Sequence, residues 1–391
     1  MKIIKVYKLK KMLYILTFIL VLTLLLVFSK ENFNNVKKSI AIFFASVLPS
    51  LFPFILFTEI VLNTHVINTI SKYLGKIISK IFKTSPNSTA AIVIGFLCGF
   101  PMGATSVTNL LESGKINKIQ AEKLLTFVNN CNPAFILSTV GIGIFSNIQI
   151  GLLLLISHYV SAIILGIIFS RKPLYNIIHK NEENLNRYYE NNNNLDKKNA
   201  YKSFFDIVKS SIVKAFFTLD IILGFMIIFN LIYLQLNNLL NYLNVNENIS
   251  LIISGIFEMT AGCVNIFSTN FSIYLKIYLI SFTLGFSGLC VICQIYSVIT
   301  KYNFSFKNLI LSKLIHGIFS AIITYILLSF TNIVDIDSIS VFGSIDNGGK
   351  INTVNYMNNI KLSYIVSTFC IILILLIYYI IRKIYIRRKN K

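Results

Sequence analysis

The chain alternates long apolar runs with short polar segments. A membrane-crossing helix needs about 20 consecutive apolar residues, and seven runs come close to this length or exceed it: 12–28, 40–62, 147–170, 216–236, 273–299, 309–330 and 362–381. A further crossing is expected over 126–145, where a cluster of asparagines lowers the local hydropathy. The pattern predicts an all-α integral membrane protein with about eight transmembrane helices.

Two shorter apolar segments, 90–102 and 251–267, predict re-entrant hairpins or broken helices. Each contains glycine and is too short to cross a membrane as one unbroken helix. The loops that flank each segment are assigned to the same side of the membrane, which also indicates a segment that enters and returns. A third element, 67–81, places Ile and Leu at helical spacing opposite a row of lysines, which predicts a helix lying on the membrane surface.

Composition supports the membrane prediction. Hydrophobic residues make up 55% of the 391 residues and charged residues only 13%, about half the charged share of a soluble globular protein. The 36 Lys and Arg against 15 Asp and Glu give a net charge of +21. These basic residues lie between apolar runs rather than on a polar surface, so no nucleic-acid partner is expected. The expected partner is the lipid bilayer.

The basic residues indicate which loops are cytoplasmic, because short cytoplasmic loops are enriched in Lys and Arg. Of the 36, 30 fall in six blocks: 1–11, 71–83, 113–123, 171–214, 301–313 and 382–391. The block 171–214 begins at Arg171 and ends at Lys214, and the block 301–313 ends at Lys313. Polar segments with few basic residues or with acidic residues predict outer loops at 29–39, 237–249 and 332–360. Both termini are therefore expected on the cytoplasmic side.

The two halves of the chain show weak internal similarity. GFLCGFPMGA at 95–104 corresponds to GIFEMTAGC at 255–263, about 160 residues later, and NNCNP at 129–133 corresponds to GFSG at 285–288, about 156 residues later. The leading helices of the halves are expected to cross in opposite directions, which predicts two inverted repeats. The predicted organisation is an N-terminal helix and loop, a first repeat, a cytoplasmic polar linker, a second repeat, and an outer loop with a C-terminal helix and basic tail: 1–38, 39–170, 171–205, 206–331 and 332–391.

Inverted repeats with broken helices that meet near mid-membrane are how many secondary transporters build a substrate site. An alternative is that the glycines at 95, 99 and 103 only allow close helix packing. Packing does not explain Pro101 within this series or the matching break in the other half. A transport function is therefore favoured.

Ionisable residues inside membrane segments are costly and point to function. Glu59 and Asp220 lie near the ends of their expected helices, where they can reach the interface or form an interhelical hydrogen bond. Glu258 lies within the second broken helix, beside Thr260 and Gly262. It can accept a proton, pair with a coupling cation or hydrogen-bond a substrate.

The NNCNP run is the second candidate. Pro133 lacks a backbone donor and disfavours helix at Asn132, so Asn129, Asn130 and Asn132 form a polar cluster at a break. The cluster is either a ligand site or a kink that its own side chains satisfy. The corresponding polar residues of the second half are Gly285, Ser287, Gly288 and Gln294, with Thr283 beside them.

No enzyme chemistry is expected. The six Cys and four His residues show no zinc-ligand spacing, and the Cys290–Cys293 pair lies within an apolar helix, where a thiol behaves as a small hydrophobic group. Nucleotide-binding, metalloprotease and serine-hydrolase motifs are absent from the sequence. Catalytic residues, metals and cofactors are therefore not predicted.

The motifs LPSLFPFILF, GFLCGFPMGA, ESGKINKIQAEKLLTFVNNCNP and GIFEMTAG, which begin at residues 48, 95, 112 and 255, resemble the YlbJ-type sporulation integral membrane proteins. These belong to the nucleoside-recognition or gate-domain superfamily. The resemblance implies a transporter or channel that moves dipicolinic acid across the outer forespore membrane into the intermembrane space of the developing spore. It also implies a substrate pathway formed by the hairpin tips and the two later breaks, and it adds Gly99, Phe100, Pro101 and Gly103 to the candidate residues.

Dipicolinate is a dianion, for which half-helix N-termini and amide donors are suitable ligands. Two other functions stay open. One is a permease for nucleosides or other small solutes, which the superfamily name suggests. The other is a non-transporting membrane scaffold that binds other sporulation membrane proteins.

Overall fold

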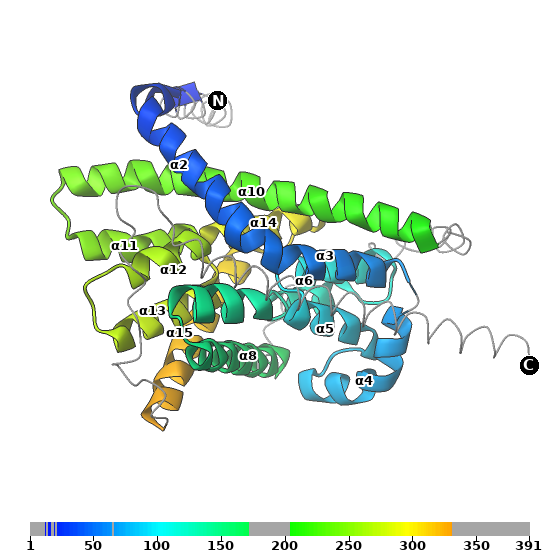
Figure 1. Cartoon of the computed structure of the whole chain (residues 1–391). Coiled ribbons are helices and arrows are strands. Elements are labelled where there is room, and N and C mark those ends of the chain that lie inside the picture. Colours follow the sequence, from blue (N-terminus) through cyan, green and yellow to red (C-terminus); the bar gives the residue numbers. More distant parts are fainter. Residues whose placement is uncertain are drawn as a thin grey trace, which may run out of the picture.

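The computed structural model describes residues 12, 15–16, 19, 22–64, 66–171 and 204–330. Within these ranges the chain is helical with short turns and contains no β-strand (Figure 1). Five helical stretches in this part are long and apolar enough to cross a membrane: Ser29–Leu62, Ile148–Phe169, Phe204–Tyr242, Ile273–Tyr302 and Phe306–Ser329. The all-α prediction is confirmed there. The expected crossing 362–381 and outer loop 332–360 lie outside the described residues, as does most of the linker 171–205.

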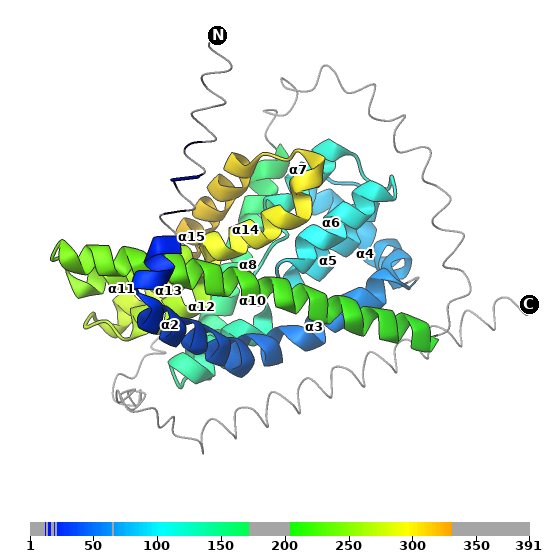
Figure 2. The ribbon, with the colours of Figure 1, turned by 90° about the horizontal axis from the view of Figure 1, so that it is seen from above.

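One continuous helical stretch begins the described fold. It consists of α2 (Ser29–Ile42), a π-helical turn (Phe43–Val47) and α3 (Leu48–Leu62), and it packs against the long helix α10 (Phe204–Tyr242). Figures 1 and 2 show these helices crossing over one face of the molecule. The prediction of a loop over 29–39 is wrong. Its polar residues bond α10 instead of water, through Gln235 to Asn32 at 2.9 Å and Asn230 to Ser39 at 2.9 Å.

Two helix pairs are each interrupted at a single break. In the first half α5 (Thr89–Leu97) packs against α6 (Met102–Glu112), and in the second half α11 (Glu247–Phe257) packs against α12 (Met259–Phe267). Both segments are broken helices, as the sequence predicts. The first pair extends ten residues beyond the expected end at 102, because α6 continues to Glu112.

The remaining helices connect these pairs. The amphipathic helix α4 (Val66–Phe82) precedes α5, and α7 (Lys118–Leu125) follows α6. The prediction of a helix over 126–145 is wrong for its first half, because residues 128–132 are non-helical. In its second half, Phe135–Ile144 form a π-helical segment. The other helices are α8 (Ile148–Arg171), α13 (Ile273–Phe286), α14 (Gly288–Ile299) and α15 (Phe306–Ser329).

Buried apolar side chains gather in two clusters. The larger one includes Leu154, Ile280 and Ile292 and lies among α8, α13, α14 and α15, and the smaller one includes Ile55 and Leu219 between α3 and α10. Many large apolar side chains on α8, α10 and α15 are exposed. Such apolar faces suit contact with lipid rather than water.

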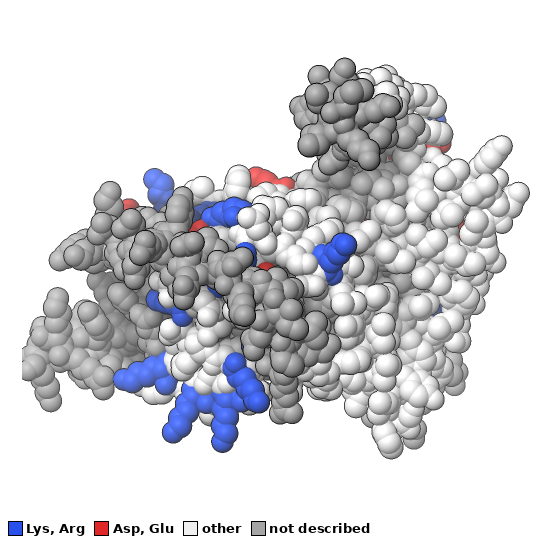
Figure 3. Space-filling model, turned by 180° about the vertical axis from the view of Figure 1, so that it is seen from behind, with Lys and Arg blue, Asp and Glu red and all other residues white. Residues whose placement is uncertain are grey.

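Charged side chains concentrate at one end of the molecule. On the face drawn in Figure 3, Lys and Arg gather mainly at the end that carries α4, and the opposite end is nearly free of them. In α4, Lys72, Lys76 and Lys80 are exposed, and so are the apolar side chains of Leu74 and Ile77. The predicted amphipathic helix is therefore confirmed, with lysine and apolar side chains both exposed at these positions.

Candidate functional site

The breaks of the two halves meet around one small cavity of about 20 Å³. Its lining brings together residues that the sequence marked as candidates in separate motifs: Phe100, Asn132, Glu258, Thr260 and Gln294. Val47 and Leu51, at the junction of the π-helical turn with α3, and Ile222 and Met226 of α10 complete one wall. The cavity is about the size of one water molecule, so the junction is closed in this conformation.

In the first half, the α5–α6 break packs directly on the NNCNP segment. The backbone N–H of Phe100 donates to the Asn130 carbonyl at 2.9 Å. Gly99 has a φ of +79°, and a Cβ there would lie 2.9 Å from the Asn132 nitrogen. A Cβ on Gly103 would lie 2.6 Å from the Val128 carbonyl oxygen. The glycines therefore serve close packing, which is the alternative that the sequence left open.

The asparagines of NNCNP satisfy much of their own segment. The Asn132 Oδ1 accepts from the Ala134 N–H at 2.7 Å, beside Pro133, and so caps the following helix. The amide nitrogens of Asn129 and Asn130 donate to the carbonyls of Leu125 and Phe127. The Oδ1 atoms of Asn129 and Asn130 are buried without a hydrogen-bond partner. A kink satisfied by its own side chains thus accounts for the amide nitrogens of Asn129 and Asn130. Their two Oδ1 atoms stay without a hydrogen-bond partner at the junction.

Glu258 caps the N-terminus of α12. Its Oε1 accepts from the Thr260 N–H at 2.9 Å and its Oε2 from the Ala261 N–H at 2.6 Å, and the residue is 2% exposed. A carboxylate at this position satisfies free backbone donors and interacts favourably with the helix dipole. In the same hairpin a Cβ on Gly262 would overlap the backbone of Gly255. Both residues thus hold the α11–α12 pair together.

The corresponding break of the second half lies between α13 and α14. Ser287 and Gly288 have φ values of +69° and +71°, and no side chain caps the start of α14. Gly285 packs on α15, where a Cβ would lie 2.7 Å from the Cα of Gly317. The first turn of α14 therefore presents backbone N–H groups at this break.

A buried lysine joins the two later breaks. The Nζ of Lys313, on α15, donates to the Asn129 carbonyl and to the Ser287 Oγ, the latter at 3.3 Å. Lys313 is 2% exposed, and the ion pairs found among the described residues, Glu59 with Lys214 and Glu112 with Lys301, do not include it. The Lys313 side-chain nitrogen thus lies at the junction, and its partners among the described residues are neutral oxygens.

Lys313 corrects the sequence prediction, which counted it among cytoplasmic basic residues. A sequence signal was available. Lys313 and His316 share a face of α15 with the buried polar residues Ser312, Ser320 and Thr324, within a run that is otherwise apolar. This polar stripe at helical spacing indicates a buried face.

Two histidines connect the NNCNP segment to the centre of the bundle. The Cys131 N–H donates to the Nε2 of His158 at 3.0 Å, and the Nε2 of His316 donates to the His158 carbonyl at 3.0 Å. Both histidines are buried. They act as hydrogen-bonding residues between α8, α15 and the break.

The two other acidic residues lie away from the junction. Glu59 on α3 forms an ion pair with Lys214 of α10 at 3.6 Å, which fits the interhelical role expected for it. Asp220 is exposed on α10. Pro101 is buried and precedes the first turn of α6.

Comparison with known proteins gives one informative match. The chain is 26% identical over 325 residues to the sporulation integral membrane protein YlbJ of Bacillus subtilis (strain 168), and the match covers 76% of this chain and 78% of that protein. The comparison confirms the resemblance to YlbJ-type proteins. No family model matches the chain, and no solved structure matches it.

Proposed function

We propose that this chain is a sporulation membrane protein that moves dipicolinic acid, a small dianion, across the outer forespore membrane. The YlbJ relative is named as a sporulation integral membrane protein, which supports the cellular role. The observation that supports an anionic solute is the buried position of Lys313. Its side-chain amino group is buried at the junction of the breaks without a carboxylate partner among the described residues.

An isolated buried charge is expensive unless an opposite charge or a strong set of hydrogen bonds offsets it. The Asn129 carbonyl and the Ser287 hydroxyl are neutral partners. A carboxylate of the solute would supply the missing negative charge. The uncapped first turn of α14 begins next to Ser287 and adds backbone donors with the positive end of a helix dipole.

Glu258 does not oppose this use of the site. Its carboxyl oxygens accept hydrogen bonds from the backbone N–H groups of Thr260 and Ala261, so both oxygens are bonded within α12. The 20 Å³ cavity is too small for dipicolinate. Passage therefore requires the hairpins to move apart, and the Glu258 cap keeps α12 helical as they do.

We further infer that the halves are inverted repeats within about eight crossings, with both termini cytoplasmic. Equivalent helices meet in pairs, since α3 packs on α10 and α8 packs on α15. The concentration of basic side chains at the α4 end supports the orientation (Figure 3).

A second candidate is a permease for nucleosides or other neutral solutes. The Oδ1 atoms of Asn129 and Asn130 and the Oε1 of Gln294 are buried acceptors without a donor. Hydroxyl groups of a neutral solute would satisfy them, whereas carboxylates would not. This reading leaves Lys313 without a role in recognition.

The test of the physiological role is the dipicolinate content of spores. A spore-forming host that lacks its own relative is complemented with the parent chain or with an empty vector. Dipicolinate is expected to be low with the vector and restored by the chain. Normal content with the vector contradicts the proposal. A scaffold is supported instead by two results together. The chain restores the dipicolinate content only when other sporulation membrane proteins are present, and the chain alone takes up no dipicolinate into liposomes.

A further inference from the structure

A second and larger cavity, of about 490 Å³, lies between α2, α10, α11 and α12. Its volume is in the range of small-molecule sites. The first turn of α12 separates it from the central junction, since Ala261 lines the large cavity while Thr260 lines the small one. The large cavity is therefore a distinct space, and nothing in the proposed transport site assigns a ligand to it.

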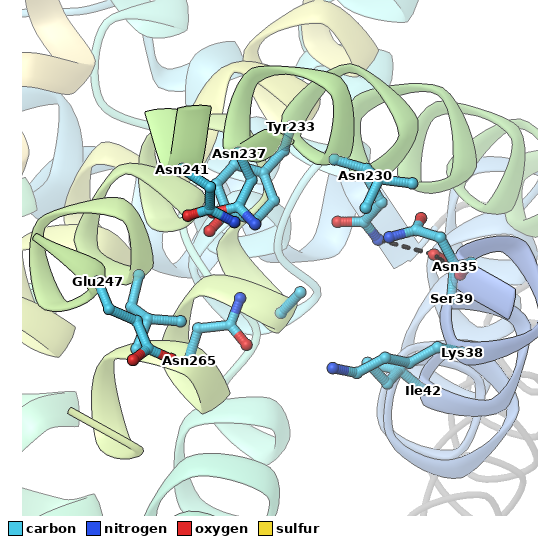
Figure 4. A pocket seen from close by; sticks show the side chains of 13 residues that line it. Asn35, Lys38, Ser39, Ile42, Asn230, Tyr233, Asn237, Asn241, Glu247 and Asn265 are labelled. Atoms are coloured by element: carbon cyan, nitrogen blue, oxygen red, sulfur yellow. Dashed lines mark hydrogen bonds between the residues drawn. The ribbon is translucent and has the colours of Figure 1, made fainter. Parts of the chain in front are cut away.

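Opposite charges stand on opposite walls of this cavity. Figure 4 shows Lys38 on the α2 side and Glu247 on the far side, with asparagine side chains between them. Lys38 and Glu247 form no ion pair with each other, and the hydrogen bonds found among the described residues do not include either side chain. The walls thus provide one cation and one anion, separated and unpaired within the described chain.

Carboxamides supply the hydrogen-bonding groups between these charges. Asn241 and Asn265 lie on the α10 and α12 walls, and Asn35 lies on the α2 wall (Figure 4). The Asn265 amide nitrogen is held by the Ser254 hydroxyl at 3.0 Å, which fixes this side chain. The Asn35 Oδ1 is a buried acceptor without a partner. A ligand with both donors and acceptors fits such a lining.

We propose that this cavity binds a small zwitterion, with its anionic group at Lys38 and its ammonium group at Glu247. The charge arrangement selects against a dianion, because its second negative group would face the Glu247 carboxylate. The ligand therefore belongs to a different chemical class from the solute proposed for the junction. A free zwitterion and the headgroup of a zwitterionic lipid share this chemistry.

Ligand-dependent thermal stability of the purified full chain in detergent tests the proposal. The probes are free glycerophosphoethanolamine, phosphatidylethanolamine, and phosphatidylglycerol with the same acyl chains. We expect a saturable rise in Tm with at least one ethanolamine probe and a smaller rise with phosphatidylglycerol. Lys38→Gln and Glu247→Gln should each weaken binding about tenfold. Lys37→Gln and Asp206→Asn, exposed residues outside the cavity lining, should bind like the parent.

A charge-exchanged variant, Lys38→Glu with Glu247→Lys, separates the two sources of the ligand. A free zwitterion can turn around, so the exchange should restore binding that each single reversal abolishes. A headgroup held by its acyl chains cannot turn, so phosphatidylethanolamine binding should stay lost. The proposal is overturned if neither ethanolamine probe raises Tm, if phosphatidylglycerol is equally effective, or if Lys38→Gln and Glu247→Gln bind like the parent.

Discussion

The imidazole rings of His158 and His316 lie with their centroids 4.5 Å apart, although the residues are 158 positions apart in the chain. The sequence separation of 158 residues falls between the offsets of about 156 and 160 residues that relate the similar motifs of the two halves. The two rings meet where α8 packs on α15. The contact is what a two-fold relation between inverted halves would produce.

His158 should contribute to stability through its bond from the Cys131 amide. Replacing it with Phe keeps a ring but removes the acceptor, which leaves a buried N–H unpaired and costs about 1–3 kcal/mol. Ser157→Ala is the matched control, because the adjacent Ser157 Oγ is buried without a partner. Denaturant midpoints in detergent should fall for His158→Phe and stay near the parent for Ser157→Ala. Equal midpoints for the two variants would show that the bond contributes little.

Gly95 should tolerate no side chain. A Cβ at this position would overlap the Val128 carbonyl oxygen, whereas a Cβ on Gly224 would meet no atom within 4 Å. We expect Gly95→Ala to reduce the yield of folded protein sharply in size-exclusion chromatography. Gly224→Ala should retain full yield. Its stability should rise by up to about 1 kcal/mol, because alanine lowers the conformational entropy of the unfolded chain. Normal yield of Gly95→Ala would mean that α5 does not pack on the backbone of Val128 as described.

Glu258 should act mainly as a helix cap. Glu258→Ala removes both acceptors for Thr260 and Ala261 and should cost about 0.5–2 kcal/mol. Glu258→Gln keeps one side-chain oxygen and should lose less stability while transporting near the parent rate. Melting temperature and uptake are measured on the same preparations. Full stability of Glu258→Ala would show that the cap contributes little to stability. Loss of uptake by a stable Glu258→Gln would show a role beyond the cap.

The contact of Glu112 with Lys301 and Tyr302 should make a small, pH-dependent contribution to the free energy of unfolding. Partial burial alone would raise the pKa of Glu112, but hydrogen bonds from Lys301 and Tyr302 outweigh it and hold the pKa below 4.5. The unfolded state therefore binds the proton more readily, so the contribution is full above the unfolded-state pKa and is lost as pH falls through the folded-state pKa.

Because Glu112 and Lys301 are largely exposed, the contribution should stay below about 1 kcal/mol. The measurement compares the melting temperatures of the parent and Glu112→Gln from neutral to acidic pH. The parent should be slightly more stable at neutral pH, and the difference should vanish on acidification. A difference that grows as pH falls would contradict the assigned direction.

The broken helices could be predicted from sequence because their causes are local. Gly99 and Pro133 interrupt helix through their own backbone properties, and the structure places breaks at both sites. The helical state of 29–39 could not be predicted in the same way. Asn32 and Ser39 resemble loop residues until α10 supplies their partners from about 200 residues away.

Lys313 shows the limit of charge as an indicator of sidedness. Its position near the start of an apolar run is typical of a cytoplasmic helix end. Its burial depends on Asn129 and Ser287, which the fold brings to it from distant positions. The sequence therefore predicted the breaks and omitted the lysine that joins two of them.

Uptake of labelled dipicolinate into proteoliposomes by Lys313 variants tests the central claim most directly. Lys313→Met removes the buried charge, which should leave stability unchanged or raised while lowering the initial uptake rate at least about tenfold. Lys307→Met, at an exposed position on the same helix, should transport at the parent rate. Unlabelled nucleosides should not compete. Uptake by a folded Lys313→Met variant at the parent rate would contradict the claim, as would a parent chain that takes up nucleosides and no dipicolinate.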